Sequence, residues 1–442
     1  GEFLTMKVYT LGGYEEVGMN MTAVEVDGEV VIFDMGYNME NVINAEGHVD
    51  EMTTNQSLEI GAVPEDEPVL DKNVVGIVIG HGHLDHVGGI PKLAGSHDCP
   101  IYCTPYTAEI VERGLDDDRK NAGNQVIRLE KGETMDLTGK LTLEFAHVNH
   151  SIPDATLSLL DTPEGYVVYG NDMKIDQSPV IEETTDVDRL KEVGEEGVKC
   201  MIPGTTRVDS PGRARSEESV EVELRDVLES CYDSGGAVFF STFSSQISRL
   251  NSVIEANDGR RQIIFIGRSL KEYVESAEKL DLINTDQIEV VSYFDEVEEK
   301  MDEVDAARED YLVVATGNQG EPGAQLDKMA SGTYPFDFEE GDHMIFSSNV
   351  IPTPVNEANR HKLETKLEDK GVRIYPGIHT TGHAHKEDHR DFINFLDPEH
   401  IVPSHGTIQK LGSYVELARE EGYSLGEDVY ISENGKCINL DE

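Results

Sequence analysis

The sequence has few cysteines, few basic residues and no long apolar run, and each shortage excludes a class of protein. Only five cysteines occur in 442 residues, widely spaced and without a CxxC pair, which argues against a disulfide-stapled fold and against a thiolate zinc site. No apolar run approaches the roughly 18 residues needed to span a bilayer, and no charged-then-apolar leader opens the chain. We therefore expect a soluble, cytoplasmic protein with no membrane partner.

The shortage of basic residues is extreme, with 36 against 87 acidic residues and a formal net charge of -51. The acids are dispersed along the chain and form no acidic tail, so a disordered acidic segment does not explain them. A salt-rich cytoplasm does, because at about 1 M salt the Debye length falls to roughly 3 Å and surface repulsion is screened. We expect a halophilic archaeon as the source, a statement about solubility and not about function.

The length exceeds the usual size of one hydrophobic core, which predicts two domains or one domain with a large insertion. Gly1–Thr5 resembles a cloning remnant before a native start at Met6. Short strands, each ending in a polar loop, are predicted at Met6–Thr10, Ala23–Val26, Val30–Asp34, Val74–Ile79, Leu141–Ala146 and Tyr166–Tyr169. Polar groups at such strand ends can converge on one rim of a sheet.

After about Thr206 helices and strands alternate, which indicates a parallel sheet covered by helices. The predicted elements are a helix over Val220–Cys231, strand Ala237–Phe240, helix Ile247–Ile254, strand Gln262–Ile266, helix Leu270–Leu280 and strand Tyr311–Ala315. The chain then returns to strands and a His-rich loop, at Val372–Tyr375, Gly377–His389 and Ile401–Gly406. We interpret the alternating part as an insertion within the first domain.

The segment His81-Gly82-His83-Leu84-Asp85-His86-Val87-Gly88-Gly89 packs four ligand-type side chains into six residues after an apolar strand. Such groups would repel and desolvate one another if merely buried, whereas divalent cations give each one a partner. The alternative is a solvated loop that happens to hold histidines. His150, Asp172 and His405 each follow another predicted strand. Nitrogen and oxygen ligands without thiolate suit Zn²⁺ or Mn²⁺.

This HxHxDH pattern, followed by a later His, Asp and His, resembles the metallo-β-lactamase superfamily. The resemblance implies an α/β fold, an αββα sandwich that holds two divalent metal ions, with Zn²⁺ preferred and Mn²⁺ as the alternative. It assigns His81, His83 and His150 to one ion, Asp85, His86 and His405 to the second, and Asp172 to both. It also makes Asp34 the residue that orients the histidine loop, where the alternative is a strand-ending turn.

The segment Gly12–Asn20 and five later motifs resemble the β-CASP nucleases, and among them the archaeal-type ribonuclease J family. These motifs are Thr242–Gln246, Gly267–Ser269, Thr316–Pro322, Phe346–Pro352 and His379–His385. The resemblance implies an inserted β-CASP domain with a parallel α/β sheet, and domain limits of 6–206, 207–376 and 377–442. Independently, Gly- and hydroxyl-rich loops at strand ends offer donors that cradle a phosphate.

By the same resemblance, RNA and its terminal 5′-phosphate would be bound by Ser244, Ser245, Arg268, Ser347, Ser348, Asn349, Thr381, Gly382 and His383. Asp85, Asp172 and His383 would be catalytic, His383 as an acid for the leaving oxygen or, alternatively, as a simple phosphate donor. Arginines around the insertion would line an RNA channel or be ordinary surface charges: Arg207, Arg213, Arg215, Arg249, Arg260, Arg261 and Arg268.

The function implied is a 5′-to-3′ exoribonuclease. It would hydrolyse single-stranded RNA with a 5′-monophosphate, using a hydroxide activated by two metals, and release 5′-mononucleotides. A homodimer is expected by analogy. The alternatives are a β-CASP endoribonuclease or 3′-end-processing factor, a small-ester metallo-hydrolase, and a non-catalytic RNA-binding relative, which would have lost a metal ligand.

Overall fold

The computed structural model describes residues 5–45, 49–118 and 122–441, so residues 1–4 of the expected cloning remnant lie outside it. The chain forms two compact units. Unit 1 comprises the described parts of Gly1–Asp176, Glu183–Ala214 and Gly382–Glu442, and unit 2 comprises Gln177–Glu182 and Arg215–Thr381. The chain thus leaves unit 1 and returns to it, as an insertion does. The changeovers at 214/215 and 381/382 lie a few residues beyond the limits expected from sequence, and those domain limits stay a prediction.

Unit 1 contains two β-sheets. The seven-stranded sheet has the order β19-β1-β2-β3-β4-β5-β6, and the six-stranded sheet has the order β18-β11-β10-β9-β8-β7. The first sheet is formed by β1 (Met6–Gly12), β2 (Met21–Val26), β3 (Glu29–Phe33), β4 (Asn73–Val78), β5 (Ile101–Cys103), β6 (Val126–Arg128) and β19 (Lys436–Asn439). The second is formed by β7 (Thr134–Asp136), β8 (Thr142–His147), β9 (Thr156–Asp161), β10 (Tyr166–Gly170), β11 (Val198–Pro203) and β18 (His400–Ile401).

The two sheets of unit 1 pack face to face through every second residue of their strands, because successive side chains of a strand point to opposite faces of the sheet. Val31 and Phe33 of the first sheet share one buried cluster with Phe145 and Tyr169 of the second. The rings of Phe33 and Tyr169 stack with centroids 4.9 Å apart. The neighbouring positions of the second sheet, such as Val168, face outward and pack in a second cluster with residues of two helices.

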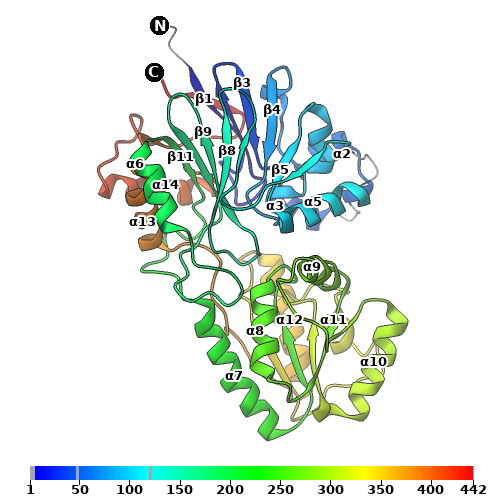
Figure 1. Cartoon of the computed structure of the whole chain (residues 1–442). Helices are drawn as coiled ribbons and strands as arrows, with labels where there is room; N and C mark the ends of the chain where they lie inside the picture. Colours follow the sequence, from blue (N-terminus) through cyan, green and yellow to red (C-terminus); the bar gives the residue numbers. More distant parts are fainter. Residues whose placement is uncertain (1–4, 46–48, 119–121, 442) are drawn as a thin grey trace. The chain divides into compact units, whose positions relative to one another are not determined.

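Helices cover both outer faces of this sandwich. Figure 1 shows α6, α13 and α14 on one side of the sheets and α2, α3 and α5 on the other. The helices of unit 1 are α1 (Met39–Asn44), α2 (Thr54–Glu59), α3 (Leu84–Val87), α4 (Ile90–Leu93), α5 (Pro105–Asp117), α6 (Val187–Glu196), α13 (Lys386–Leu396) and α14 (Ile408–Glu420). The predicted αββα sandwich is therefore confirmed.

Unit 2 is built on one six-stranded sheet with the order β14-β13-β15-β12-β16-β17, in which every neighbouring pair is parallel. The strands are β12 (Val238–Ser241), β13 (Gln262–Ile266), β14 (Glu289–Val291), β15 (Tyr311–Ala315), β16 (His343–Phe346) and β17 (Arg373–Tyr375). The helices are α7 (Glu217–Ser234), α8 (Ile247–Asn257), α9 (Arg268–Glu278), α10 (Phe294–Ala306), α11 (Gln325–Ala330) and α12 (Pro354–Glu368). The parallel sheet predicted for the insertion is confirmed.

Two predictions near the C-terminus were wrong. The segment Gly377–His389, expected as a loop, enters helix α13 at Lys386, because His385 and Asp388 form a capping box and Phe392, Ile393 and Leu396 bury one helix face. Within Ile401–Gly406, the strand expected before His405 is shorter than predicted, because β18 covers only His400–Ile401, and His405 itself adopts a left-handed conformation with φ 55°. In the described ranges, no helix is long and apolar enough to cross a membrane.

Candidate metal centre

The histidine loop follows β4, and backbone hydrogen bonds from the segment after β3 hold it in place. Met35 N donates to His86 O at 2.8 Å and Tyr37 N donates to Leu84 O at 2.9 Å. Between them, Gly36 passes so close that a Cβ there would lie 1.6 Å from Asp85 O. A side chain at this position would displace the turn that presents Asp85 and His86. The short helix α3 carries these two ligand-type side chains. Its backbone lies so close to the facing segment that only glycine fits at position 36.

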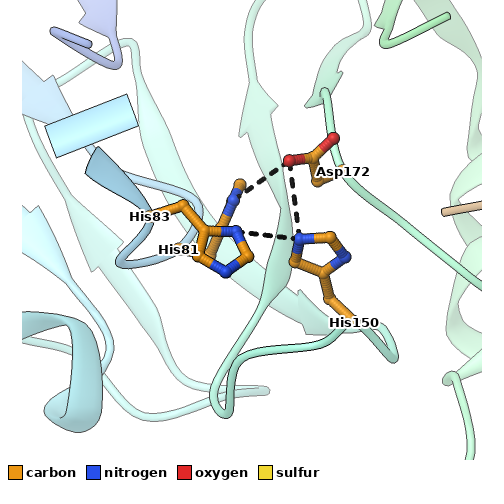
Figure 2. Close-up of side chains that lie close together, drawn as sticks. All are labelled: His81, His83, His150 and Asp172. Atoms are coloured by element: carbon orange, nitrogen blue, oxygen red, sulfur yellow. Dashed lines mark hydrogen bonds and ion pairs between the residues drawn. The ribbon is translucent and has the colours of Figure 1, made fainter. Parts of the chain in front are cut away.

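The first group of ligand-type residues is His81, His83, His150 and Asp172, each offering one atom within 4.8 Å of the others. Figure 2 shows the four side chains pointing toward one another from three different segments. His81 Nε2 lies 3.2 Å and His150 Nε2 lies 3.5 Å from Asp172 Oδ2, while His150 Nε2 lies 3.1 Å from His83 Nδ1. Three nitrogens and a carboxylate oxygen around one point are a donor set for a divalent cation.

The second group is Asp85, His86, Asp172 and His405, again with one atom of each within 4.8 Å of the others. His86 Nε2 lies 3.1 Å from Asp172 Oδ2, and His405 Nε2 lies 3.3 Å from Asp172 Oδ1. Asp85 Oδ2 lies 3.6 Å from each of these two Nε2 atoms. The two groups share Asp172, whose Oδ2 faces His81, His150 and His86 and whose Oδ1 faces His405.

The electrostatics of the cluster favour the neutral forms of His81, His83 and His150 beside a charged carboxylate. Burial lowers the pKa of His81, and it lowers the pKa of His83 and His150 well below the usual range. Burial also raises the pKa of Asp172, but the neighbouring His383, His405 and His150 outweigh this effect and hold that pKa well below its usual range. Neutral imidazole and ionised carboxylate are the forms that bind metal ions.

Two buried polar atoms of the cluster give a further reason to expect a metal ion there. Among the described residues, His81 Nε2 and Asp172 Oδ1 are buried atoms without a hydrogen-bond partner. Burying such atoms costs free energy unless something satisfies them, and each faces the centre of the cluster. A cation at this place would satisfy them both.

Asp34 lies directly behind His86, as the resemblance implied. Its buried carboxylate accepts a hydrogen bond from His86 Nδ1 at 2.7 Å, from Tyr169 Oη at 2.9 Å and from Gly80 N at 3.3 Å. Burial lowers the pKa of His86, but Asp85 and Asp34 outweigh it and hold that pKa well above the usual range. Asp34 has φ 62°, a strained conformation that the three hydrogen bonds maintain. By binding Nδ1, Asp34 directs His86 Nε2 to the cluster.

Several supporting residues were missed by sequence reasoning. Tyr169 Oη accepts from Asn171 Nδ2 at 2.7 Å, and Asn171 Oδ1 accepts from Ser404 Oγ at 2.6 Å, which ties the end of β10 to the segment after β18, next to His405. Gly18 N donates to His405 Nδ1 at 3.0 Å. From the sequence, only the strand Tyr166–Tyr169 that carries Tyr169 was predicted.

Gly382 and His383, predicted as RNA contacts, belong to unit 1 and lie at this cluster. Gly382 O lies 2.6 Å from His150 Nδ1, and a Cβ on Gly382 would lie 2.6 Å from Ser151 N. His383 Nδ1 lies 3.1 Å from Asp172 Oδ1, and its side chain is 26% exposed. Gly382 therefore supports a ligand-type histidine, whereas His383 is the partly exposed imidazole beside the carboxylate.

The other predicted RNA contacts lie in unit 2, at the carboxyl ends of its parallel strands. Ser244 and Ser245 follow β12, Arg268 follows β13, and the segment Ser347–Asn349 follows β16. Thr381 lies further along the chain after β17. Carboxyl ends of parallel strands meet at one edge of a sheet, the usual ligand edge of such folds. Ser244 Oγ lies 2.8 Å from Ser269 Oγ, and Arg268 and Asn349 are exposed.

Ser347 differs from its neighbours. It is fully buried, and its hydroxyl donates to Ile378 O at 2.6 Å and accepts from Arg249 Nη1 at 2.8 Å. Its hydroxyl therefore faces the interior of unit 2 and is bound there by the chain's own groups, and the phosphate contact expected for it stays a prediction. Ser348 Oγ, also buried, accepts from Asn318 Nδ2 at 2.8 Å.

The arginines expected to line an RNA channel mostly have partners within their own unit. Arg249 and Arg261 are buried, which corrects the expectation for both. Ion pairs join Arg213 to Asp388 and Asp391, Arg215 to Glu223, Arg260 to Asp233 and Arg268 to Glu272. These contacts offset much of the positive charge that a polyanion would meet.

Three family models match successive parts of the chain. The model described as beta-lactamase superfamily domain matches residues 53–211, ribonuclease J, beta-CASP domain matches 235–363, and Zn-dependent metallo-hydrolase RNA specificity domain matches 371–432. Ribonuclease J of Methanocaldococcus jannaschii is 41% identical over 99% of this chain and 99% of its own length. Ribonuclease J of Pyrococcus abyssi is 44% identical over 99% of this chain and 98% of its own length. The chain belongs to the ribonuclease J family.

The likeness extends to bacterial members of the family. Ribonuclease J of Mycoplasma genitalium is 30% identical over 98% of this chain, which covers 73% of that relative. A crystal structure of a protein of unknown function from Enterococcus faecalis shares the fold, with a TM-score of 0.68 at 18% identity over 99% of this chain and 100% of that one. Family membership confirms the predicted metallo-β-lactamase and β-CASP domains and the prediction of a metal-dependent nuclease.

Proposed function

We propose that the chain is a 5′-to-3′ exoribonuclease that hydrolyses single-stranded RNA bearing a 5′-monophosphate and releases 5′-mononucleotides. The observation that carries the proposal is the pair of four-residue groups that share Asp172, in a chain of the ribonuclease J family. His81, His83 and His150 would hold one divalent ion, Asp85, His86 and His405 a second, and Asp172 both. We propose Zn²⁺ in both places, with Mn²⁺ as the alternative, because the donors are imidazole and carboxylate.

When bound, two such ions supply an activated water as nucleophile and stabilise charge on the phosphate oxygens. The chain's own residues supply the rest. Among the described residues, His383 is the one imidazole paired with Asp172 that neither four-residue group includes, and it is partly exposed. A protonated His383 would donate its proton to the leaving oxygen, and Asp172, 3.1 Å from its Nδ1, would hold the ring in place.

The proposed specificity for RNA rests on unit 2. A small-ester hydrolase would have no use for such an insertion, whereas loops at the carboxyl ends of its strands carry the hydroxyl and backbone donors that a phosphate binds. Ser244, Ser245, Ser348 and Thr381 are the proposed contacts. The homodimer and the cytoplasmic location stay predictions.

The test is a time course with Zn²⁺ or Mn²⁺ on single-stranded RNA that carries a 5′-monophosphate and a 3′ label, run beside a circular form of the same RNA. We expect the 3′ label to appear directly in a terminal mono- or dinucleotide, without intermediates, and the circular RNA to remain uncut. Asp85→Ala should abolish the reaction. Asp66→Ala is the matched control, because Asp66 is a buried carboxylate paired with His97 and belongs to neither group. Internal fragments or a cut circle would establish the endonuclease, and turnover of small esters alone would establish that alternative.

A further inference from the structure

A buried arginine lies at the ligand edge of the unit 2 sheet. Arg249, on α8, is fully buried, and its guanidinium forms a two-point contact with Glu217 at the start of α7. Nε donates to Glu217 Oε2 at 3.1 Å and Nη2 donates to Glu217 Oε1 at 3.0 Å. Desolvating two charges is costly, and a pair like this one is tolerated only where the remaining donors are satisfied as well.

The remaining donors of Arg249 reach the loops that follow β16 and β17. Nη1 donates to Ser347 O and to Ser347 Oγ, both at 2.8 Å. The same nitrogen lies 3.4 Å from Ile378 O and 3.2 Å from His379 Nδ1, and Nη2 lies 3.3 Å from Thr380 O. One guanidinium therefore fixes the backbone immediately before Ser348 in one loop and immediately before Thr381 in the other.

The geometry points to Arg249 as a positioning residue for recognition of the RNA 5′-phosphate, acting through the two loops that present Ser348 and Thr381. This inference rests on the proposed function, which assigns those two residues to the phosphate. Lysine cannot replace the arginine, because an ammonium has three donors on a point charge, whereas these loops need the planar fork. Glu217 has the same positioning role, since its carboxylate holds the guanidinium that contacts both loops.

A second buried arginine of unit 2 provides a matched control. Arg261 donates to Gly236 O at 2.8 Å, Tyr311 O at 3.2 Å and Arg308 O at 3.3 Å. Gly236 precedes β12 and Tyr311 begins β15, so Arg261 serves the amino-terminal edge of the same sheet. Replacing either arginine with lysine removes a buried guanidinium from unit 2, but only Arg249 contacts the loops before Ser348 and Thr381.

The experiment compares the full chain with Arg249→Lys and Arg261→Lys on three substrates. These are one RNA with a 5′-monophosphate, the same RNA with a 5′-hydroxyl, and bis(p-nitrophenyl) phosphate, which has no 5′ end. For Arg249→Lys we expect KM for the monophosphate RNA to rise about tenfold, the equivalent of about 1.4 kcal/mol, and the preference for monophosphate over hydroxyl to fall by the same factor. Hydrolysis of the small diester and the metal content should not change. Arg261→Lys should keep the wild-type preference even if it lowers the Tm.

Two other results would overturn the inference. An unchanged preference in Arg249→Lys, or an equal loss on all three substrates, would reduce Arg249 to a stabilising role. If that variant does not fold, Glu217→Gln, which keeps the shape but removes the anchoring charge, must show the same loss of preference. If the wild-type enzyme shows no preference for the monophosphate, the proposed phosphate site is refuted, and the role of Arg249 with it. If the wild-type enzyme shows the preference and both Arg249→Lys and Glu217→Gln keep it, the role of Arg249 alone is refuted.

Discussion

Replacing Asp34 with asparagine should weaken metal binding more than it weakens the fold. The Asp34 carboxylate accepts the His86 Nδ1 proton at 2.7 Å and so keeps Nε2 directed at the cluster. Asparagine has nearly the same shape, but it loses the charge and brings an N–H group among three donors. Loss of such an outer partner typically costs 10- to 100-fold in metal affinity, or about 1.4 to 2.8 kcal/mol. We expect the Kd for Zn²⁺ to rise within that range.

The assay is competition of the metal-stripped protein with a chromophoric chelator, together with urea unfolding in the absence of metal. The control is Asp66→Asn, because His97 Nε2 and Asp66 Oδ2 form another buried pair, 3.2 Å apart, outside the cluster. Both variants should lose about 1–3 kcal/mol of stability through mismatched buried donors, but only Asp34→Asn should lose affinity. A wild-type Kd in Asp34→Asn, with equal loss of stability in both, would refute the reasoning.

Asp172 belongs to both four-residue groups, so Asp172→Ala should reduce metal content, measured by native mass spectrometry, below that of His83→Ala, which damages one group only. Burial lowers the pKa of His389 from the ordinary 6.5 to about 3, so the folded chain keeps this ring neutral where the unfolded chain binds a proton. Stability is therefore lost as pH falls from about 6.5 toward about 3, by up to about 1.4 kcal/mol per pH unit, and His389→Gln should flatten that part of the urea-unfolding curve. With a net charge of -51, the Tm should rise steeply with KCl up to about 1 M, where the Debye length is roughly 3 Å, and a Tm independent of KCl would contradict the halophilic interpretation.

The ligand-type residues could be found from sequence because the chemistry is local. Four of them lie within His81–His86, and the others follow strands whose ends a sandwich brings to one rim. The strands themselves were visible as apolar runs, and the bounds of β13 and β15 were predicted to the residue. The hydrogen-bond chain from Tyr169 to Ser404 was not visible, since Ser404 is distant in sequence and reaches Asn171 only when β11 pairs with both β10 and β18.

The burial of Arg249 could not be foreseen for a related reason. Helix α8 buries polar and apolar residues alike, Ser248 and Ser252 as well as Leu250, so it has no polar face that would mark an exposed arginine. The start of α13 is a different case. His385 and Asp388 have capping-box spacing, and a buried stripe follows them, so the helix could have been recognised within the His-rich segment.

An enzyme with this charge cannot recruit RNA chiefly by long-range attraction. Arg213, Arg215, Arg249, Arg260 and Arg268 are paired with acidic side chains, so each contributes little net positive potential. We expect recognition to rest on short-range hydrogen bonds from hydroxyl and backbone N–H groups, because these weaken less than long-range attraction when salt screens charge. For single-stranded nucleic acid, the slope of log K against log[salt] is about -0.7 for each phosphate that the protein neutralises. We therefore expect a slope of log K against log[KCl] no steeper than about -2, measured by fluorescence anisotropy with the Asp85→Ala variant. A slope of about -4 or steeper would mean that a basic surface recruits the RNA after all, and that the ion pairs open to bind it.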